Sequence, residues 1–531
     1  MQVPAQEGQS ERQSAPWRWI GLITLGGFLL RVAVLARSLP VLDRVFVPDD
    51  TYYTLSIARS LAQGHGPTAD GHTLTSGFQP LQAFLLVPVH WVVGSLDGFV
   101  RADLALLVVA DTVTIAVLGW LAWRIAGRVA GITAAVVWAC SPLAIAMALG
   151  GLETSLAVCF AAVLVAVWVH AGDRSSTAWW VLAGAVAGLA VLARVDVLLL
   201  VALLGAWQLW RGPRHVLLPA GIAALVVLAP WWIYCTVQFG TPVPTSGRAE
   251  HALAPLQPFE LRGFAQIAGV VAGGPFASWR WLRTTLDERP GLGLVVFLLL
   301  VVALALVAWW WHRSLARPAS AVAVLPLYGI GLMVFYVWFG VGWYFTRYMA
   351  PVAMVVTLVI GVGVGRLWSW AGRQRAVALG IAGALAVVAL VVVGIGIVHN
   401  LTGDEPQVAT FDSYTGYRDM ALVVNERVPR GAVLAAWQSG AIGYYAGEDH
   451  TVVNLDGVVN PAAADATRDG TIPEYVRDRG VQWLADTDLR LVGFALKDAK
   501  RLDPEPKLTF LEDLPQFPRF PKYAIARIDW G

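Results

Sequence analysis

Long apolar stretches dominate the sequence and limit what this chain can fold into. Hydrophobic residues make up 57% of the chain and charged residues only 14%, whereas a soluble domain carries about 25% charged residues. A stretch of about 20 apolar residues can cross the hydrocarbon core of a bilayer as a helix. The sequence therefore predicts a polytopic α-helical membrane protein with about eleven transmembrane helices. We place these spans at roughly residues 17–37, 101–123, 129–148, 154–171, 177–193, 197–210, 216–237, 291–311, 319–341, 349–365 and 377–398.

The orientation of this bundle follows from its arginines, because cytoplasmic loops collect basic residues near the ends of spans. Residues 80–94 form an apolar run that is short for a span, so we place it in the outer interface as an amphipathic helix. All short basic connections then lie inside, at residues 124–128, 174, 211–214, 313–317 and 366–375. The same topology places the tail 1–16 in the cytoplasm. We expect the first span to be retained, because it lacks a small-residue signal-peptide cleavage site. The predicted topology is N-in and C-out, with long outer segments at 38–100 and 238–290.

The composition changes after the membrane domain, which we assign to residues 17–399. Residues 400–531 carry 20 of the 36 acidic and 14 of the 38 basic side chains. Short β patterns alternate with a helical pattern there, which predicts an extracytoplasmic soluble α/β domain. The strands are expected at 432–437, 451–455, 481–485 and 523–528, and the helix at 473–479. The three cysteines all lie in apolar runs, so no disulfide framework is expected. The charge balance excludes extensive disorder and a free nucleic-acid binder.

Three carboxylates are expected at the outer face of the membrane domain. Asp49 and Asp50 open an amphipathic segment about a dozen residues after the first span, and Glu153 lies in the outer turn ALGGLETSLAV. Each could simply favour the positive end of a helix dipole. Capping needs only one acid, however, and adjacent like charges cost energy. Converging carboxylates could bind a divalent cation such as Mg²⁺, Mn²⁺ or Ca²⁺, or could act as a general base on a hydroxyl.

Basic side chains on the same outer face could bind an anion. They are His65, Arg194, Arg248, His251 and Arg347. Most also have an ordinary structural explanation. His65 could be a turn residue between two glycines, and Arg194 could pair with a neighbouring acid in a short hairpin. Arg347 could extend from a span end toward water, and Arg248 could be a solvated loop charge.

Two further charges lie within the apolar spans. Arg31 is about six residues inside the first span, and Asp111 is about ten residues inside the next. Ionisable groups in hydrocarbon are rare and usually face a partner or a cavity. We therefore expect these two side chains to pair.

The outer motifs resemble those of GT-C glycosyltransferases. The resemblance rests on the run DDxYYxLxIARxLAxGHGxT, an interfacial helix after TSGFQP, the GLET turn and the ARVD hairpin. The layout is similar to that of actinobacterial terminal arabinofuranosyltransferases and, more distantly, aminoarabinose transferases and protein O-mannosyltransferases. The resemblance implies a multi-pass protein of the bacterial plasma membrane that uses a polyprenyl-phosphate sugar. It also implies an extracytoplasmic acceptor, either a cell-envelope glycan, a lipid or a protein.

The resemblance also implies roles for the outer residues. Asp49 would be the general base that takes a proton from the acceptor hydroxyl during an inverting transfer, while Asp50 and Glu153 would orient the acceptor or hold the cation. The donor phosphate would be bound by the basic groups Arg347, Arg248, His65 and Arg194. Contacts to the sugar or the acceptor would come from Tyr53, Gln79 and His251.

Two other functions fit the same composition. A transporter or flippase of lipid-linked sugars would also contain buried charges, and a membrane-anchored protein could bind or assemble envelope glycan through its outer domain. The ionisable groups cluster at the outer face and the two halves show no repeat, which favours the transferase over the transporter. About eleven spans also exceed what an anchor needs. The sequence has no P-loop, Rossmann glycine pattern, HExxH or zinc-binding Cys/His spacing.

Overall fold

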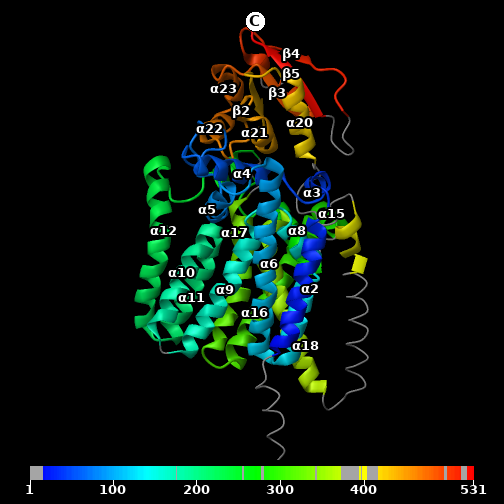
Figure 1. Ribbon diagram of the computed structural model, residues 1–531. Coiled ribbons are helices and arrows are strands. Elements are labelled where there is room, and N and C mark those ends of the chain that lie inside the picture. The colour runs from blue at the N-terminus through cyan, green and yellow to red at the C-terminus, as the bar shows by residue number, and fades with distance from the viewer. Residues whose placement is uncertain are drawn as a thin grey trace, which may run out of the picture.

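A bundle of helices forms most of the molecule, and a small α/β domain covers one end of it (Figure 1). The computed structural model describes residues 16–174, 176–253, 256–276, 280–340, 344–371, 394–395, 397–403, 416–494, 499–515 and 523–531. Seven of the described helices are long and apolar enough to cross a membrane, and one bent helix pair would make an eighth. The fold class predicted from the sequence is therefore confirmed, whereas the number of spans and their orientation stay predictions.

The long helices match the expected spans closely. They are α2 (Trp17–Leu35), α6 (Leu96–Ala126), α9 (Thr154–Asp173), α12 (Leu217–Phe239), α16 (Pro290–Ser314), α17 (Val324–Phe339) and α18 (Ala350–Ala371). The short turns η4 (Ala319–Ala323) and η5 (Thr346–Met349) precede α17 and α18. The last expected span, 377–398, lies almost entirely outside the described residues.

Three expected spans are broken or short. The span expected at 129–148 is divided into α7 (Arg128–Ala139) and α8 (Pro142–Ala148), which meet at a bend of 56°. Pro142 begins α8. Proline has no backbone N–H to donate, so it breaks a continuous helix and favours the first turn of a new one. The other two are α10 (Thr177–Ala193) with 17 residues and α11 (Leu198–Arg211) with 14.

The two segments that the sequence predicts outside the membrane, called the first and second outer segments, contain helices that are too short to span. The first contains α3 (Leu39–Val45), α4 (Asp49–Ala62) and α5 (Pro80–His90). Helix α5 has 11 residues, so it is about 16 Å long and cannot cross a core of about 30 Å. Its length agrees with the interfacial helix predicted there. The second outer segment contains α13 (Ser246–Leu253), α14 (Leu261–Val271), η3 (Gly274–Phe276) and α15 (Arg280–Glu288).

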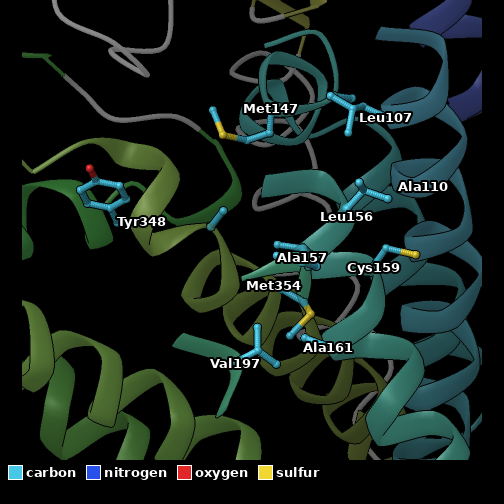
Figure 2. Packing of buried hydrophobic residues seen from close by; sticks show 14 of the residues in the cluster. Leu107, Ala110, Met147, Leu156, Ala157, Cys159, Ala161, Val197, Tyr348 and Met354 are labelled. Carbon is cyan, nitrogen blue, oxygen red and sulfur yellow. The ribbon is translucent and has the colours of Figure 1, made fainter. Parts of the chain in front are cut away.

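Small residues allow the helices of the bundle to approach closely. A Cβ atom added to Gly184 of α10 would lie 2.0 Å from the carbonyl oxygen of Ala220 in α12. Likewise, a Cβ on Gly365 of α18 would lie 2.7 Å from the Cβ of Ala130 in α7. Such small-residue contacts are the usual way in which membrane helices pack. Figure 2 shows the buried side chains between α6, α9 and α18, among them Leu107, Leu156 and Met354.

The two charges within the apolar spans form a buried ion pair. The Nε atom of Arg31 lies 2.5 Å from Oδ2 of Asp111, and both side chains are almost completely buried. The guanidinium also donates to the carbonyl oxygens of Gly27, Trp138 and Ala139, at 3.0, 3.3 and 2.9 Å. The Trp138 indole donates to the other oxygen of Asp111 at 2.9 Å. The expected pairing is therefore confirmed, and it joins α2, α6 and α7.

The C-terminal domain is built on a five-stranded sheet with the order β2-β1-β3-β5-β4. Three strands are parallel: β1 (Val433–Ala436), β2 (Thr451–Asn454) and β3 (Trp483–Thr487). Strand β5 (Tyr523–Asp529) pairs antiparallel with β3, and β4 (Lys507–Phe510) pairs antiparallel with β5. The described helices of the domain are α20 (Tyr417–Arg427), α21 (Gly440–Ala446), α22 (Pro461–Asp469), α23 (Ile472–Asp478) and α24 (Asp488–Gly493). The four expected strands are confirmed, and β4 was not expected.

Polar contacts join this domain to the first outer segment. Asp43 of α3 accepts hydrogen bonds from the Tyr52 hydroxyl at 2.5 Å and from the backbone N–H of Arg418 at 3.2 Å. The Arg418 guanidinium pairs with Asp97 at 2.7 Å, and the Tyr445 hydroxyl donates to the same carboxylate at 2.9 Å. Helices α3, α4 and α6 are thus connected to α20 and α21.

A second set of contacts surrounds Tyr53 of α4. Its hydroxyl donates to Asp456 at 2.9 Å and accepts from the Asn454 amide at 2.8 Å. Asn454 ends β2 and Asp456 follows it closely, so the carboxyl edge of the parallel strands faces the membrane domain. Burial raises the pKa of Asp456 to about 7 and that of Asp43 to about 7.

The Arg31–Asp111 pair predicts an asymmetric mutational response. Removing one partner leaves a buried charge without compensation, which typically costs about 3–5 kcal/mol. We expect Arg31→Met and Asp111→Asn each to lower the thermal unfolding midpoint of the detergent-purified protein. The double variant should be more stable than the less stable single variant. Equal tolerance of single and double changes would contradict the pairing.

The buried acids between the domains predict that stability falls as the pH rises. Asp43 and Asp456 have raised pKa values near 7 in the folded chain, whereas an unfolded Asp titrates near pH 4. Between these values the folded state binds more protons than the unfolded state, so the free energy of unfolding decreases with pH. We expect a thermal midpoint a few degrees lower at pH 8 than at pH 5. Asp456→Asn should reduce the difference between the two midpoints. A midpoint that is higher at pH 8 than at pH 5 would contradict the prediction.

Candidate functional site

The adjacent acids Asp49 and Asp50 begin α4 but have different surroundings. Asp49 is 2% exposed, and its two oxygens accept the backbone N–H groups of Gly440 and Ala441 at 2.7 and 2.8 Å. These are the first N–H groups of α21, which have no partner within the helix. Asp49 therefore caps a helix of the other domain. Burial raises the pKa of Asp49 to about 8, although the two N–H donors act in the opposite direction.

The close approach at this cap requires glycine. A Cβ atom at Gly440 would lie 2.2 Å from the backbone oxygen of Asp49, which no side chain could tolerate. Because both Asp49 oxygens are occupied in the interface, this carboxylate is poorly placed to receive the proton of an acceptor hydroxyl. Both oxygens of Asp49 thus take part in docking, and the base role expected for Asp49 stays a prediction.

Asp50 is the more accessible acid of the pair. Its side chain is 36% exposed and lies 2.7 Å from Nη2 of Arg347, which is only 7% exposed. Arg347 belongs to η5, directly before α18. Its guanidinium lies over the rings of Phe345 and Tyr348, at 4.4 and 5.4 Å from their centroids. The structure therefore places a cation and a partly exposed carboxylate together at the end of the bundle that the α/β domain covers.

A second charged cluster surrounds Arg194. Its guanidinium pairs with Asp196 at 2.8 Å and with Glu153 at 3.1 Å, and it donates to the Tyr336 hydroxyl at 2.8 Å. Tyr336 in turn donates to Asp196 at 3.0 Å. The pairing of Arg194 with Asp196, anticipated as the structural explanation, is present. Glu153 extends the cluster to the amino end of α9.

Tyr348 and Glu250 connect the two clusters. The rings of Tyr348 and Tyr336 stack with centroids 5.0 Å apart, and Arg194 lies 5.5 Å from the Tyr348 centroid. The Tyr348 hydroxyl donates to Glu250 of α13 at 2.8 Å. Burial raises the pKa of Glu250, and the Arg347 charge opposes this increase. The charged groups of both clusters thus occupy one continuous region.

Glu250 was missed in the sequence, although two of its neighbours were selected. Arg248 and His251 are three residues apart, so they share one face of α13, and both are exposed. Glu250 lies on another face, which contacts Tyr348. Helical periodicity applied to the segment TSGRAEH was the signal that could have separated the inward acid from the outward bases.

Several expected ligand contacts lie elsewhere. Arg248 is exposed and pairs with Asp465 of α22 at 3.2 Å, and the His251 ring lies 6.0 Å from the Phe339 ring. His65 is exposed in a turn between glycines that both have φ of 82°. Within the described ranges, none of these three has a hydrogen bond or ion pair with Asp50 or Arg347.

The two expected sugar contacts in the first outer segment also have other surroundings. Tyr53 is used for docking to Asp456 and Asn454. Gln79 directly precedes α5, and its buried Oε1 atom has no hydrogen-bond partner in the described part of the chain.

The carboxylates do not form a shared cation site. Among the described residues, no three His, Cys, Asp or Glu side chains form a group that could hold a metal ion. Asp49 accepts two backbone N–H groups, Asp50 pairs with Arg347, and Glu153 pairs with Arg194. The expectation of one divalent cation bound jointly by Asp49, Asp50 and Glu153 therefore does not fit this arrangement.

Comparison with known sequence families identifies two segments of the chain. Residues 88–234 match a family described as dolichyl-phosphate-mannose-protein mannosyltransferase. Residues 406–525 match a domain of unknown function (DUF8728). No curated protein sequence matches the chain.

Solved structures with similar folds cover nearly the whole chain. ArnT from Cupriavidus metallidurans bound to undecaprenyl phosphate has a TM-score of 0.57 and 16% identity, covering 96% of this chain and 98% of ArnT. The archaeal oligosaccharyltransferase AglB from Archaeoglobus fulgidus, in complex with an inhibitory peptide and a dolichol-phosphate, has a TM-score of 0.51 and 10% identity. That match covers 90% of this chain and 70% of AglB.

A further structure concerns metal binding. The oligosaccharyltransferase of Archaeoglobus fulgidus in complex with Zn and sulfate has a TM-score of 0.56 and 13% identity, covering 90% of this chain and 69% of that one. Residues 88–234 thus match the mannosyltransferase family model, and nearly the whole chain shares the fold of ArnT and AglB.

Proposed function

We propose that the chain transfers a sugar from a polyprenyl-phosphate donor to an acceptor hydroxyl at the end of the bundle covered by the α/β domain. The observation that carries the proposal is the contact between Asp50 and Arg347 at 2.7 Å. A carboxylate and a guanidinium supply the two functions that this reaction requires, a proton acceptor and a partner for the phosphate. Undecaprenyl phosphate and dolichol-phosphate are bound to ArnT and AglB, which share this fold.

The transfer proceeds by a single inverting displacement. The acceptor oxygen forms a bond to the anomeric carbon while Asp50 takes the hydroxyl proton. The bond between the anomeric carbon and the phosphate oxygen breaks, and its electron pair leaves with the polyprenyl phosphate. Arg347 stabilises the negative charge that develops on this leaving group. The Arg194 cluster positions Tyr348 and Arg347 through ring stacking and charge.

Donor binding would also act on Asp50, because Asp50 and Arg347 pair when no donor is bound. While the two side chains pair, the guanidinium of Arg347 occupies one oxygen of Asp50. A donor phosphate would offer Arg347 another anion to bind, and the hold of Arg347 on Asp50 would decrease. Donor binding would therefore release Asp50 to accept the proton of the acceptor hydroxyl.

The positions of basic residues support an extracytoplasmic location for the active site. Leu96, at the start of α6, accepts a hydrogen bond from Tyr444 of the α/β domain, and Arg124 lies at the other end of this helix. Arg366 donates to the Ile125 carbonyl oxygen, so it shares the end of the bundle that contains Arg124. Because cytoplasmic ends collect arginine, the opposite end with the α/β domain is proposed to be outside the bacterial plasma membrane.

The direct test supplies labelled donors to membranes that contain the protein. Polyprenyl-phosphate mannose and polyprenyl-phosphate arabinofuranose, labelled in the sugar, are incubated with these membranes and with membranes lacking the protein. Transfer of label to glycan, lipid or protein supports the proposed function and identifies the acceptor class. Movement of intact donor across the bilayer without transfer would instead indicate a flippase.

Asp50 and Asp49 should respond differently to the same substitution. Asp50→Asn removes the proposed base, so we expect a rate about 10²- to 10⁴-fold lower, with an unchanged pattern of limited proteolysis. Asp49→Asn removes one acceptor at the α21 cap and costs about 1–3 kcal/mol, so it should increase cleavage near the domain junction. Loss of transfer in Asp49→Asn with intact docking, and retention in Asp50→Asn, would return the base role to Asp49.

Replacement of Arg347 should mainly affect the use of donor. Arg347→Ala removes a charged hydrogen-bond donor to the phosphate, typically worth about 1.5–3 kcal/mol, so the apparent KM for donor should rise at least about tenfold. The apparent KM for acceptor should change little. Arg262→Ala is the matched control, because this arginine of α14 is exposed and its contact with Asp287 is long, at 3.8 Å. An unchanged donor KM in Arg347→Ala would rule out phosphate binding by this residue.

A further inference from the structure

A polar crevice lies in the α/β domain at the carboxyl ends of two neighbouring parallel strands. Gln438 follows β1, Asp486 and Thr487 end β3, and Arg490 lies in α24. Tyr417, Met420 and Tyr523 complete the lining, and the crevice is partly open to solvent. Figure 1 shows α20, which begins at Tyr417, beside the sheet.

The connectivity of the sheet makes this position a natural binding site. The chain passes from β1 to β2 on one side, and β3 then pairs with β1 on the other side. The strand order therefore reverses between β1 and β3. In open α/β sheets, ligands bind in the crevice outside the carboxyl ends of the strands at such a switch point.

The crevice shares a backbone segment with the acidic pair of the membrane domain. One oxygen of Asp486 accepts the N–H groups of Trp437 and Gln438 at 2.9 and 3.0 Å. The same segment continues to Gly440 and Ala441, which bond to Asp49. A ligand beside Gln438 would thus lie only a few residues along the chain from the contact that holds Asp49.

The charges of the same acids affect the two tyrosines that line the crevice. Burial raises the pKa of the Tyr417 phenol, and the charges of Asp49 and Asp50 raise it further. Burial and the charges of Asp486 and Asp49 likewise raise the pKa of Tyr523. Because Gln438 is only two residues from Gly440, the crevice lies close to the contact between α21 and Asp49.

The lining indicates the chemical class of the ligand. Asp486 is 1% exposed and lies 3.7 Å from Arg490, so the two charges compensate each other and favour a neutral ligand. Tyrosine rings offer flat apolar faces, while amide, guanidinium and hydroxyl groups offer hydrogen bonds. Neutral carbohydrates present the complementary pattern of hydroxyl groups and apolar C–H faces.

We propose that this crevice binds the carbohydrate portion of the acceptor and presents its hydroxyl to Asp50. The inference rests on the proposed sugar transfer for the identity of the ligand as an acceptor, but carbohydrate binding itself can be measured without transfer. Gln438 and Arg490 supply the hydrogen bonds, and Tyr417 and Tyr523 form the wall. A peptide acceptor would place different groups here and is the alternative that the test separates.

The binding experiment uses the full-length protein in detergent. Ligand-observed NMR is recorded with methyl α-mannopyranoside, methyl α-arabinofuranoside, a disaccharide of each sugar and a serine-containing peptide. We expect saturation transfer to at least one carbohydrate, with loss of the signal in Gln438→Ala and Arg490→Ala. Arg477→Ala is the matched control, because this arginine of α23 is exposed and pairs only with its neighbour Asp478 among the described residues. Signals from the peptide alone, from no probe, or equally from all variants would overturn the proposal.

The transfer assay separates this inference from the proposed function. For Arg490→Ala we expect an apparent KM for acceptor about tenfold higher, as the loss of one charged hydrogen bond predicts, with an unchanged KM for donor. Thermal unfolding confirms that the variant is folded. If the unmodified protein transfers sugar and Arg490→Ala has normal acceptor kinetics, the crevice is not the acceptor site although the proposed function stands. Carbohydrate binding at the crevice without any transfer would contradict the proposed function alone.

Discussion

The carboxylate of Asp49 and two backbone N–H groups of α21 hold the two domains of this molecule together at the site. Each oxygen receives one hydrogen bond, and the glycine at position 440 permits the close contact. Asp50 follows directly on the same helical turn, so its position relative to the α/β domain is determined by the contact that its neighbour makes. The pairing of Asp50 with Arg347 then relates this turn to the start of α18. Domain docking and the arrangement of charged groups consequently depend on one another.

Two adjacent acids of the same type therefore perform different tasks. Asp49 is enclosed and satisfied by backbone donors, while Asp50 is partly exposed and satisfied by a guanidinium. A backbone donor cannot move away from its partner without disruption of the fold, whereas an arginine side chain can exchange one anion for another. This difference in mobility explains why the proposal assigns proton transfer to Asp50. It also explains why a substitution at either position needs a separate measurement of docking.

Hydropathy and charge predicted the bundle well, because the cost of polar groups in hydrocarbon leaves few alternatives. The pairing of Arg31 with Asp111 could be predicted for the same reason. The role of Asp49 could not, since its partners are backbone N–H groups and these have no sequence signature. Glu250 was missed because its selection depends on which face of α13 contacts Tyr348. The short β patterns located four strands, but the order of those strands, which creates the crevice, follows from long-range pairing.

The Arg31–Asp111 pair has a consequence for the rotation of the first helix about its own axis. Most of α2 faces outward, with Leu22, Leu25 and Leu29 all exposed. Its buried stripe is narrow and consists of Ile20, Gly27, Arg31 and Val34. A shift by one residue turns a helix by about 100° and would point the guanidinium into lipid. The ion pair thus helps to fix the rotation of α2 about its axis. Because α2 leads directly into α3 and α4, the rotation of α2 also affects the direction in which the chain reaches Asp49 and Asp50.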